Sequence, residues 1–186
     1  MGKIGSPQPV KLIASLIFGD HGSFSLTVKG MVSLWGPLDF MSELMPFDYT
    51  SYYAEEMGTH LCRRIVSFEP LINPQGLWHI KHLTNNLEEK HSPVPQRRAV
   101  NIDPGYIGLH HFILATTKSC THRPYLQEGI YADLTLIYLG KSFRPLPWTY
   151  PDYQSQTVIE IMNLLRQKCL LQLKAGGHLE PHHAES

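Results

Sequence analysis

The chain has 186 residues, of which 42% are hydrophobic and 17% are charged. These values are typical of one globular domain with a sizeable core, and they exclude a disordered or fibrous chain. Sixteen basic residues balance sixteen acidic ones, so any site for an anion must be a local cluster, and nucleic acid is not a favoured partner. The three cysteines, Cys62, Cys120 and Cys169, are far apart and predict free thiols rather than a disulfide framework.

The first ninety residues predict three strands and two helices. Residues 10–18 form an apolar run that predicts a buried strand and is too short to cross a membrane, so no membrane partner and a cytoplasmic location are expected. Residues 23–35 have apolar side chains at helical spacing, followed by Gly36-Pro37 as a stop. The other predicted elements are strands at 38–47 and 61–71, an aromatic loop with one helical turn at 47–58, and a helix from Asn73 through Leu87.

The second half predicts a strand, a helix, a hairpin and a last helix. Residues 97–103 predict a strand that Pro104-Gly105 turns into a helix at 106–118. The hairpin joins strands 129–139 and 141–146 around Gly140-Lys141, and Ser155 caps the last amphipathic helix. We therefore expect a single domain over residues 1–175 and a flexible, histidine-containing tail over residues 176–186.

The order of these elements predicts the fold class. The first part reads β-α-β-β-α-β, which is typical of an α+β protein with a ferredoxin-like antiparallel sheet and helices on one face. The C-terminal hairpin and helix would extend this sheet. The other face of such a sheet is free to carry a site.

Polar side chains recur at alternate positions of three predicted strands and would share one face of the sheet. The ligand-binding and acidic candidates on this face are Arg63, Glu69, Asn101, Asp103, Tyr131, Asp133 and Thr135. One interpretation is a solvated outer face, which antiparallel sheets commonly have. The tyrosines, the asparagine and the threonine among the charges favour a pocket instead.

A cationic cluster follows the predicted helix at 106–118. Lys118, His122 and Arg123 lie within six residues, and their chemistry suits a phosphate or a carboxylate. Tyr106, at the start of that helix, is a further ligand-binding candidate. The alternative is that these cations only complement the negative end of the helix, which is worth about 0.3–1 kcal/mol.

Four residues are candidates for acid–base chemistry or metal binding. Asp133 ranks first because it lies in the middle of a strand, and Glu69 ranks second. Asp103 could instead be the N-cap of the predicted helix, which would lower its pKa and make it a poor base. Together with His122 these carboxylates could hold a divalent cation through oxygen ligands, although their spacing does not require one.

Two aromatic segments could form the walls of a pocket or close an edge of the core. They are FDYTSYY at residues 47–53 and WTYPDY at residues 148–153. The chain contains no P-loop, no GxGxxG, no GxSxG and no HExxH motif. The common phosphate-loop, dinucleotide, serine-hydrolase and zinc-protease signatures are therefore excluded.

Seven segments resemble an uncharacterised prokaryotic family, domain-of-unknown-function family 4416. In chain order they are FDYTSYYAEEMG, RRIVSFEPLINP, VNIDPGY, LATTK, HRPYL, GIYADLTLIY and WTYPDY. The similarity covers roughly residues 9–165. Members are sometimes labelled GTP-binding proteins, but this chain has neither a P-loop nor an NKxD guanine motif. The resemblance implies no established activity, so no catalytic residue transfers from it.

Three hypotheses for function follow from the residues. The first is a small enzyme that acts on a phosphorylated or otherwise anionic small molecule, nucleotide-derived molecules included, with Asp133 as base or metal ligand. The second is a binding module for a nucleotide or single-stranded RNA, which needs stacking aromatic residues and a basic groove. The third is a scaffold subunit of a larger assembly, which would form a homodimer or meet another chain.

Overall fold

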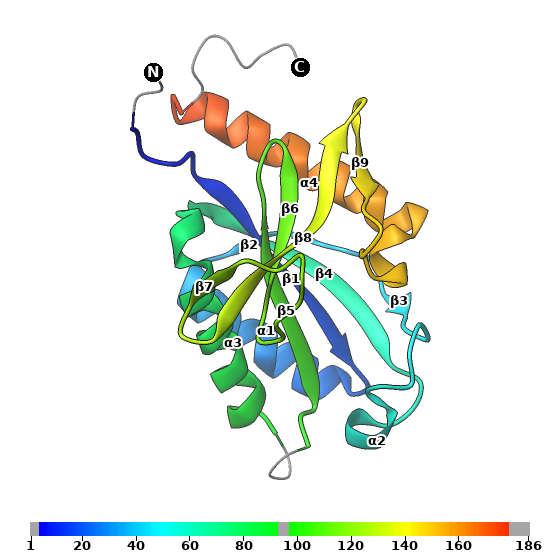
Figure 1. The fold of residues 1–186 in the computed structure, drawn as a ribbon. Coiled ribbons are helices and arrows are strands. Elements are labelled where there is room, and N and C mark those ends of the chain that lie inside the picture. The colour runs from blue at the N-terminus through cyan, green and yellow to red at the C-terminus, as the bar shows by residue number, and fades with distance from the viewer. Residues whose placement is uncertain (1–3, 93–96, 179–186) are drawn as a thin grey trace.

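The computed structural model describes residues 4–92 and 97–178, which form one open antiparallel sheet with helices on both faces (Figure 1). Seven of its nine strands follow the order β2-β4-β1-β5-β6-β8-β7, with β3 beside β4 and β9 beside β8. The strands are β1 (Val10–Phe18), β2 (Leu38–Met41), β3 (Met45–Pro46), β4 (Cys62–Ile72), β5 (Val100–Ile107), β6 (His111–Thr116), β7 (Tyr125–Gln127), β8 (Ile130–Leu139) and β9 (Ser142–Pro145). The helices are α1 (His21–Trp35), α2 (Ala54–Met57), α3 (Leu77–Lys90) and α4 (Gln156–Ala175).

Strand β1 lies at the centre of the sheet and is buried along its whole length. Leu12 and Leu16 face α1 and α3, whereas Ile13 packs on the other face with side chains of α4. A strand covered on both faces needs apolar residues at successive positions, not only at alternate ones. This arrangement confirms the strand that the apolar run predicted.

Helices α1 and α3 are found where the sequence predicted helices, but α1 begins at His21 rather than Ser23 and α3 begins at Leu77, after the predicted Asn73-Pro74 start. The Asp20 side chain accepts a hydrogen bond of 2.6 Å from the Ser23 N–H, and Gly36 follows the last turn of α1 with a positive φ of 88°. The Asn73 side chain caps a short 3₁₀ turn, Pro74–Gly76, that leads directly into α3. Both helices are therefore fixed by local capping as well as by their apolar faces.

The predicted turn at Pro104-Gly105 and the predicted helix at 106–118 are wrong. Strand β5 continues through both residues, and the next element is strand β6. A Cβ atom on Gly105 would lie 2.4 Å from the carbonyl oxygen of Ile113, so this glycine allows two strands to approach closely. Asp103 consequently lies within a strand and is not a helix N-cap.

The predicted strand at 38–47 is divided into β2 and β3. Between them the Ser42 side chain accepts a hydrogen bond of 2.9 Å from the Ile65 N–H, and the Ser42 N–H donates to the Ile65 carbonyl at 2.8 Å. A serine hydroxyl can replace a backbone acceptor in this way. The interruption lets the chain leave the edge of the sheet, while the Ile65 N–H and carbonyl of β4 keep hydrogen-bond partners.

The C-terminal hairpin and helix are confirmed. Gly140 and Lys141 join β8 to β9 with φ values of 58° and 70°, as a type I′ turn requires. The Ser155 side chain accepts a hydrogen bond from the Val158 N–H at the start of α4. Met162 and Leu165 then pack on the face of the sheet opposite α1 and α3.

Strand β8 contains a bulge that changes which residues share a face. Leu134 pairs with Ile113 and Leu136 pairs with Phe112, so Thr135 is an extra residue. Asp133 and Leu136 therefore point to the same side of the sheet, although strict alternation places them on opposite sides. The alternation of side chains between the two faces that the sequence predicts for β8 therefore holds only up to Asp133.

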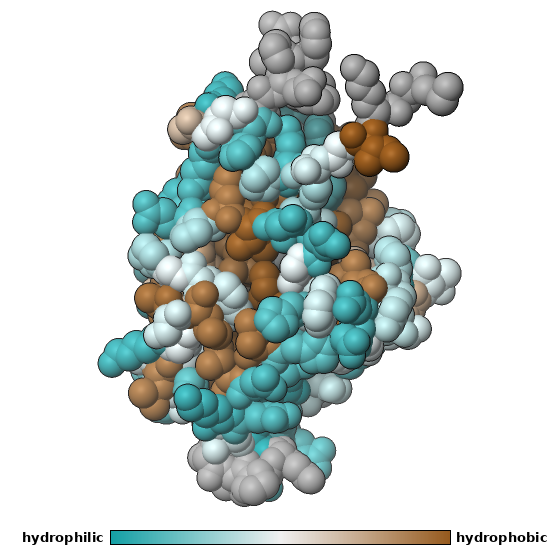
Figure 2. Space-filling view, turned by 90° about the vertical axis from the view of Figure 1, so that its left-hand side faces the viewer, coloured by the Kyte–Doolittle hydropathy of each residue, from teal (hydrophilic) through white to brown (hydrophobic). Residues whose placement is uncertain are grey.

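The α+β class is confirmed, and the sheet is open and entirely antiparallel. Within the described ranges no helix is both long and apolar enough to cross a membrane. Figure 2 shows apolar and polar side chains mixed on the side of the molecule where α3 lies. Residues 93–96 and residues 179–186 of the predicted tail lie outside the described residues.

Candidate functional site

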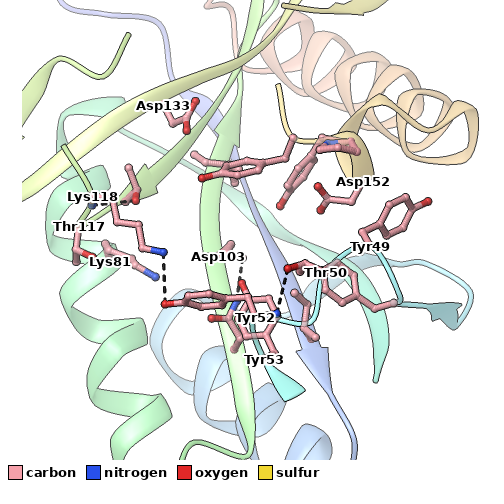
Figure 3. A pocket seen from close by; sticks show the side chains of 18 of the residues that line it. Tyr49, Thr50, Tyr52, Tyr53, Lys81, Asp103, Thr117, Lys118, Asp133 and Asp152 are labelled. Atoms are coloured by element: carbon pink, nitrogen blue, oxygen red, sulfur yellow. Dashed lines mark hydrogen bonds between the residues drawn. The ribbon is translucent and has the colours of Figure 1, made fainter. Parts of the chain in front are cut away.

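A cavity of about 450 Å³ opens on the α4 side of the sheet, beyond the end that α4 covers (Figure 3). Its floor is formed by β1, β5, β6 and β8, and its walls by residues 47–53, 116–118 and 150–153 and by the Lys81 side chain, which reaches it from α3. This volume is typical of sites for small molecules. Both aromatic segments of the sequence contribute to the walls.

Three aspartates line the cavity, and only two of them are neutralised by a cation. Asp133 is 5% exposed and accepts a hydrogen bond of 2.8 Å from Arg123. Asp152 forms an ion pair of 2.9 Å with Arg63, and burial raises the pKa of Asp152. Asp103 accepts a hydrogen bond of 2.9 Å from Asn101, and no ion pair to it exists in the described part of the chain. Asp103 is thus the aspartate of the cavity whose carboxylate keeps unused hydrogen-bond acceptor positions.

Two lysines of the cavity also lack an acidic partner within the described residues. Lys81, on α3, is 7% exposed and donates a hydrogen bond of 2.9 Å to the Ile102 carbonyl, while Glu88 attracts it at longer range. The exposed Lys118 lies 4.4 Å from the centre of the Tyr52 ring and 3.4 Å from its hydroxyl. Figure 3 shows both lysines on the same side of the cavity.

The two arginines that line the cavity are fully engaged by the protein. Arg123 donates to Asp133, to the Lys118 carbonyl and to the Tyr150 hydroxyl, with lengths of 2.8, 3.1 and 2.9 Å. These bonds join the loop after β6 to β8 and to the segment before α4. Although burial opposes its charge, the hydrogen bond to Tyr150 and the charge of Asp133 raise the pKa of Arg123. Arg123 therefore positions the wall of the cavity.

Arg98 has a similar role on the other side. It contacts Glu56 at 3.0 Å and Glu88 at 3.4 Å, and it donates a hydrogen bond of 2.7 Å to the Asn101 side-chain oxygen. Because Asn101 in turn donates to Asp103, this chain of bonds fixes the orientation of the Asp103 carboxylate. Asp103 is thus preorganised by its neighbours.

Two tyrosines place hydroxyl groups near Asp103. Burial, together with the charge of Asp103, raises the pKa of Tyr53 well above its ordinary value, so the phenol stays protonated. Tyr153 is 3% exposed, and burial raises its pKa in the same direction. The Tyr153 hydroxyl makes no hydrogen bond of acceptable geometry within the described chain, although Ser15 lies near enough to act on it electrostatically.

Five predicted residues line the cavity, and two more lie directly behind its wall. The five are Asn101, Asp103, Lys118, Arg123 and Asp133. Arg63 lies behind, bonded to Ser15 at 2.7 Å and to Asp152. His122 also lies behind: it stacks on Trp148, and its Nε2 atom is 3.7 Å from Asp133, too far for a hydrogen bond.

Four predicted residues do not join this group. Glu69 is exposed and lies in a register shift of β4 at the far end of the strand. Tyr106 faces α3 on the other side of the sheet, and Tyr131 packs against Tyr125 at the edge. Thr135 is the bulged residue of β8, and its hydroxyl donates to the Asp133 carbonyl at 3.0 Å.

Several cavity residues were missed in the sequence. Lys81 belongs to the buried stripe of α3 together with Leu77, Ile80 and Thr84, and a lysine on an apolar stripe is the signal that could have found it. Arg98 and Asp152 carry no such pattern because their positions depend on loops. Tyr53 was part of an aromatic segment that was noted without singling out this residue.

The described residues contain no group of three or more histidine, cysteine, aspartate or glutamate side chains that could hold a metal ion. Asp133 and Asp103 lie in one cavity, but each is bonded to a protein donor and Glu69 is remote. The carboxylates predicted as metal ligands therefore do not converge. Nothing in their geometry calls for a divalent cation.

The fold and the cavity define an α+β protein with a polar pocket of small-molecule size. The chain belongs to the family described as domain of unknown function DUF4416, whose model matches residues 8–169. This match confirms the family that the seven sequence segments resemble. Neither a curated protein nor a solved structure matches the chain significantly.

Proposed function

We propose that the cavity binds a phosphorylated or otherwise anionic small molecule, and that Asp103 acts on the bound molecule as a general base. The observation that carries this proposal is that two lysines, Lys81 and Lys118, form no ion pair within the described residues and lie on one side of a cavity that also holds Asp103. An anion would neutralise the lysines. The same ligand would lie within reach of a carboxylate that forms no ion pair within the described residues.

Lys81 and Lys118 suit an anion because both ammonium groups have donors to spare. Lys81 uses one of its three N–H bonds on the Ile102 carbonyl, and Lys118 makes one long contact with Tyr52. The hydroxyl groups of Thr116 and Thr117 line the same wall. Hydrogen bonds between an ammonium group and a phosphate are about twice as strong as neutral ones.

Asp103 suits the role of base because its surroundings hold it in place without neutralising it. Asn101 donates to one of its oxygens, and Arg98 fixes Asn101. Asp133, the first candidate from the sequence, is bonded to Arg123 and is a poorer base for that reason. The proposal therefore moves the reacting carboxylate from Asp133 to Asp103.

Thermal shift assays with inorganic phosphate, pyrophosphate and sugar phosphates test the binding step. A ligand that binds the native state raises the unfolding midpoint by mass action. We expect Lys118→Gln to weaken binding about tenfold or more, because hydrogen bonds to charged groups contribute about 1.5–3 kcal/mol. Lys29→Gln, which removes an exposed lysine from α1 on the other side of the sheet, is the matched control.

The absence of a midpoint shift with every anion tested would contradict the proposal. Equal losses in Lys118→Gln and Lys29→Gln would show a nonspecific effect of net charge. Asp103→Asn tests the catalytic step, since it should keep the affinity for inorganic phosphate and abolish turnover once a reaction is known. Retention of turnover in that variant would assign the base elsewhere.

The exposed tyrosines at the cavity favour a second candidate, a site for a nucleotide or for single-stranded RNA. Tyr49, Tyr52 and Tyr150 are 48%, 59% and 47% exposed, and all three line the cavity. Aromatic rings of this kind can stack on a base. Binding of oligoribonucleotides that weakens steeply with salt and is lost in Tyr52→Ala would support this candidate.

We also infer that β2, β4, β1 and β5 form a ferredoxin-like unit with α1 and α3. The four strands are adjacent in that order, and both helices contribute to one core cluster with β1. The remaining strands and α4 extend this unit. An experimental structure with α1 and α3 on opposite faces of the sheet would contradict the assignment.

A further inference from the structure

We infer that the ligand of this cavity is a phosphorylated polyol, whose phosphate binds Lys81 and Lys118 and whose hydroxyl group lies between Asp103 and Tyr53. This inference rests on the proposed function and adds the chemical class of the ligand. It is carried by the hydrogen-bonding capacity that the protein leaves unused beside the two lysines.

Asp103 provides an unused acceptor. One of its oxygens accepts from Asn101, and neither an ion pair nor another hydrogen bond to its carboxylate is found within residues 4–92 and 97–178. An ionised carboxylate has about four acceptor positions and no donor. Its natural partner in a ligand is therefore a group that carries a hydrogen.

Tyr53 provides an unused donor. Its hydroxyl has no hydrogen-bond partner in the described chain, and its ring is held by Phe47 at 5.9 Å and by the Arg98 guanidinium at 5.7 Å. Tyr53 and Asp103 both line the cavity, and no hydrogen bond joins them within the described residues. The inferred hydroxyl group lies between them.

Three kinds of ligand group can be compared at this position. A second anion would be repelled by Asp103 and Asp152. An ammonium group would pair with Asp103 but has no acceptor, so it would leave the Tyr53 O–H without a partner. A hydroxyl group donates to Asp103 and accepts from Tyr53, so it satisfies both groups without adding charge.

A hydrogen bond from Lys81 to the backbone next to Asp103 connects the anion position to the hydroxyl position. Lys81 donates to the carbonyl of Ile102, the residue before Asp103. Figure 3 shows Lys81, Lys118, Tyr53 and Asp103 around one part of the cavity. A single small molecule with a phosphate and a hydroxyl a few bonds apart can therefore reach both positions.

Calorimetric titration with three phosphate esters tests this inference. Ribose 5-phosphate carries the hydroxyl groups, n-pentyl phosphate lacks them, and 5-aminopentyl phosphate replaces them with an ammonium group. We expect ribose 5-phosphate to bind about tenfold more tightly than either analogue. Neither analogue can both donate to Asp103 and accept from Tyr53, so at least one of these polar groups stays without a partner.

Variants then assign the difference to residues. Tyr53→Phe should reduce the preference for ribose 5-phosphate over n-pentyl phosphate to about twofold. Asp103→Asn should do the same while leaving the affinity for n-pentyl phosphate unchanged or higher, since it removes a repelling charge. Tyr131→Phe, a tyrosine outside the cavity, should change neither affinity.

The outcomes separate the two proposals. Equal binding of ribose 5-phosphate and n-pentyl phosphate, both weakened by Lys118→Gln, would overturn the polyol and retain the anion site. Tighter binding of 5-aminopentyl phosphate would assign an amine to the Asp103 position and would also overturn the polyol. Failure of all three esters to bind would overturn the anion site itself.

Discussion

The two ends of β1 carry buried charge on the same face of the sheet, and the protein uses it differently at each end. At the end covered by α4, the fully buried Lys11 bonds to Asp39 at 2.7 Å, to the Phe68 carbonyl at 2.9 Å and to Gln172 at 2.7 Å. At the cavity end, the half-buried Asp103 and the exposed Lys118 form no ion pair in the described chain, beside the ion pairs of Asp133 and Asp152. Burial of charge alone therefore does not identify a site, whereas unused bonding capacity does.

The largest expected effect is at the α4 end. Lys11→Met removes the cation from a buried network and leaves Asp39 without its main partner, which costs about 3–5 kcal/mol of the free energy of unfolding. Chemical denaturation measures this loss. Lys174→Met, at an exposed position of α4, should stay within about 0.5 kcal/mol of the parent. A Lys11→Met variant as stable as the control would show that the network contributes little.

The next effect lies in the wall of the cavity. Arg123→Met breaks three hydrogen bonds and leaves the buried Asp133 without its cation, so we expect a loss of about 1.5–3 kcal/mol in the free energy of unfolding. Ligand affinity should fall as well, because the loop that carries Lys118 is no longer fixed. Arg144→Met, at an exposed position of β9, is the matched control. Loss of affinity without loss of stability would instead indicate that Arg123 contacts the ligand.

A smaller effect of different sign is expected at Asp103. Asp103→Asn removes a charge that forms no ion pair within the described residues and interacts only at longer range with Arg63, so stability should change by less than about 1 kcal/mol and rise rather than fall. Denaturation without ligand measures this change. A loss above about 2 kcal/mol would show that the Asp103 charge serves the fold.

The smallest expected effect is a difference in pH dependence between the two ends. Burial opposes ionisation of Asp39, yet the hydrogen bonds from Lys11 and Ser67 prevail and hold its pKa below the ordinary value of about 3.9. The stabilisation by Asp39 is therefore complete above this value and is lost as the pH falls through the lowered pKa. Burial raises the pKa of Asp152, so its contribution has the opposite sign: the folded state gains stability as the pH falls from the raised pKa toward the ordinary value.

The unfolding free energies of Asp39→Asn and Asp152→Asn, each compared with the parent between pH 3 and pH 7, test these signs. The difference between parent and Asp39→Asn should shrink with acid. For Asp152→Asn, the parent should gain stability relative to the variant over the same range. Parallel curves for the two variants would show that the two carboxylates have the same environment.

Much of the fold could be predicted from local patterns in the sequence. The apolar run at 10–18, the stop at Gly36-Pro37, the Gly140-Lys141 turn and the cap at Ser155 each have a local physical cause, and each is found in the structure. The helix predicted at 106–118 failed because Pro-Gly usually marks a turn. Here Gly105 serves the close approach of β6, which is a tertiary contact that a local pattern does not contain.

The site could be predicted in part for a similar reason. The alternation of side chains along strands correctly predicted that Asn101, Asp103 and Asp133 share one face of the sheet. This prediction holds because β5 and β8 contain no bulge before these residues. Glu69 failed because β4 changes register before it. The pairing of Arg123 with Asp133 could not be predicted, since it depends on how a loop folds back over a strand.

The bulge at Thr135 places one extra residue in β8 opposite β6. Asp133 faces the cavity and Leu136 faces the core under α4, and one extra residue between them makes both orientations compatible. At their present spacing of three residues, a β8 without the bulge would turn one of the two side chains to the wrong layer. Changes that straighten the strand at Thr135 should consequently disturb either the cavity or the core under α4.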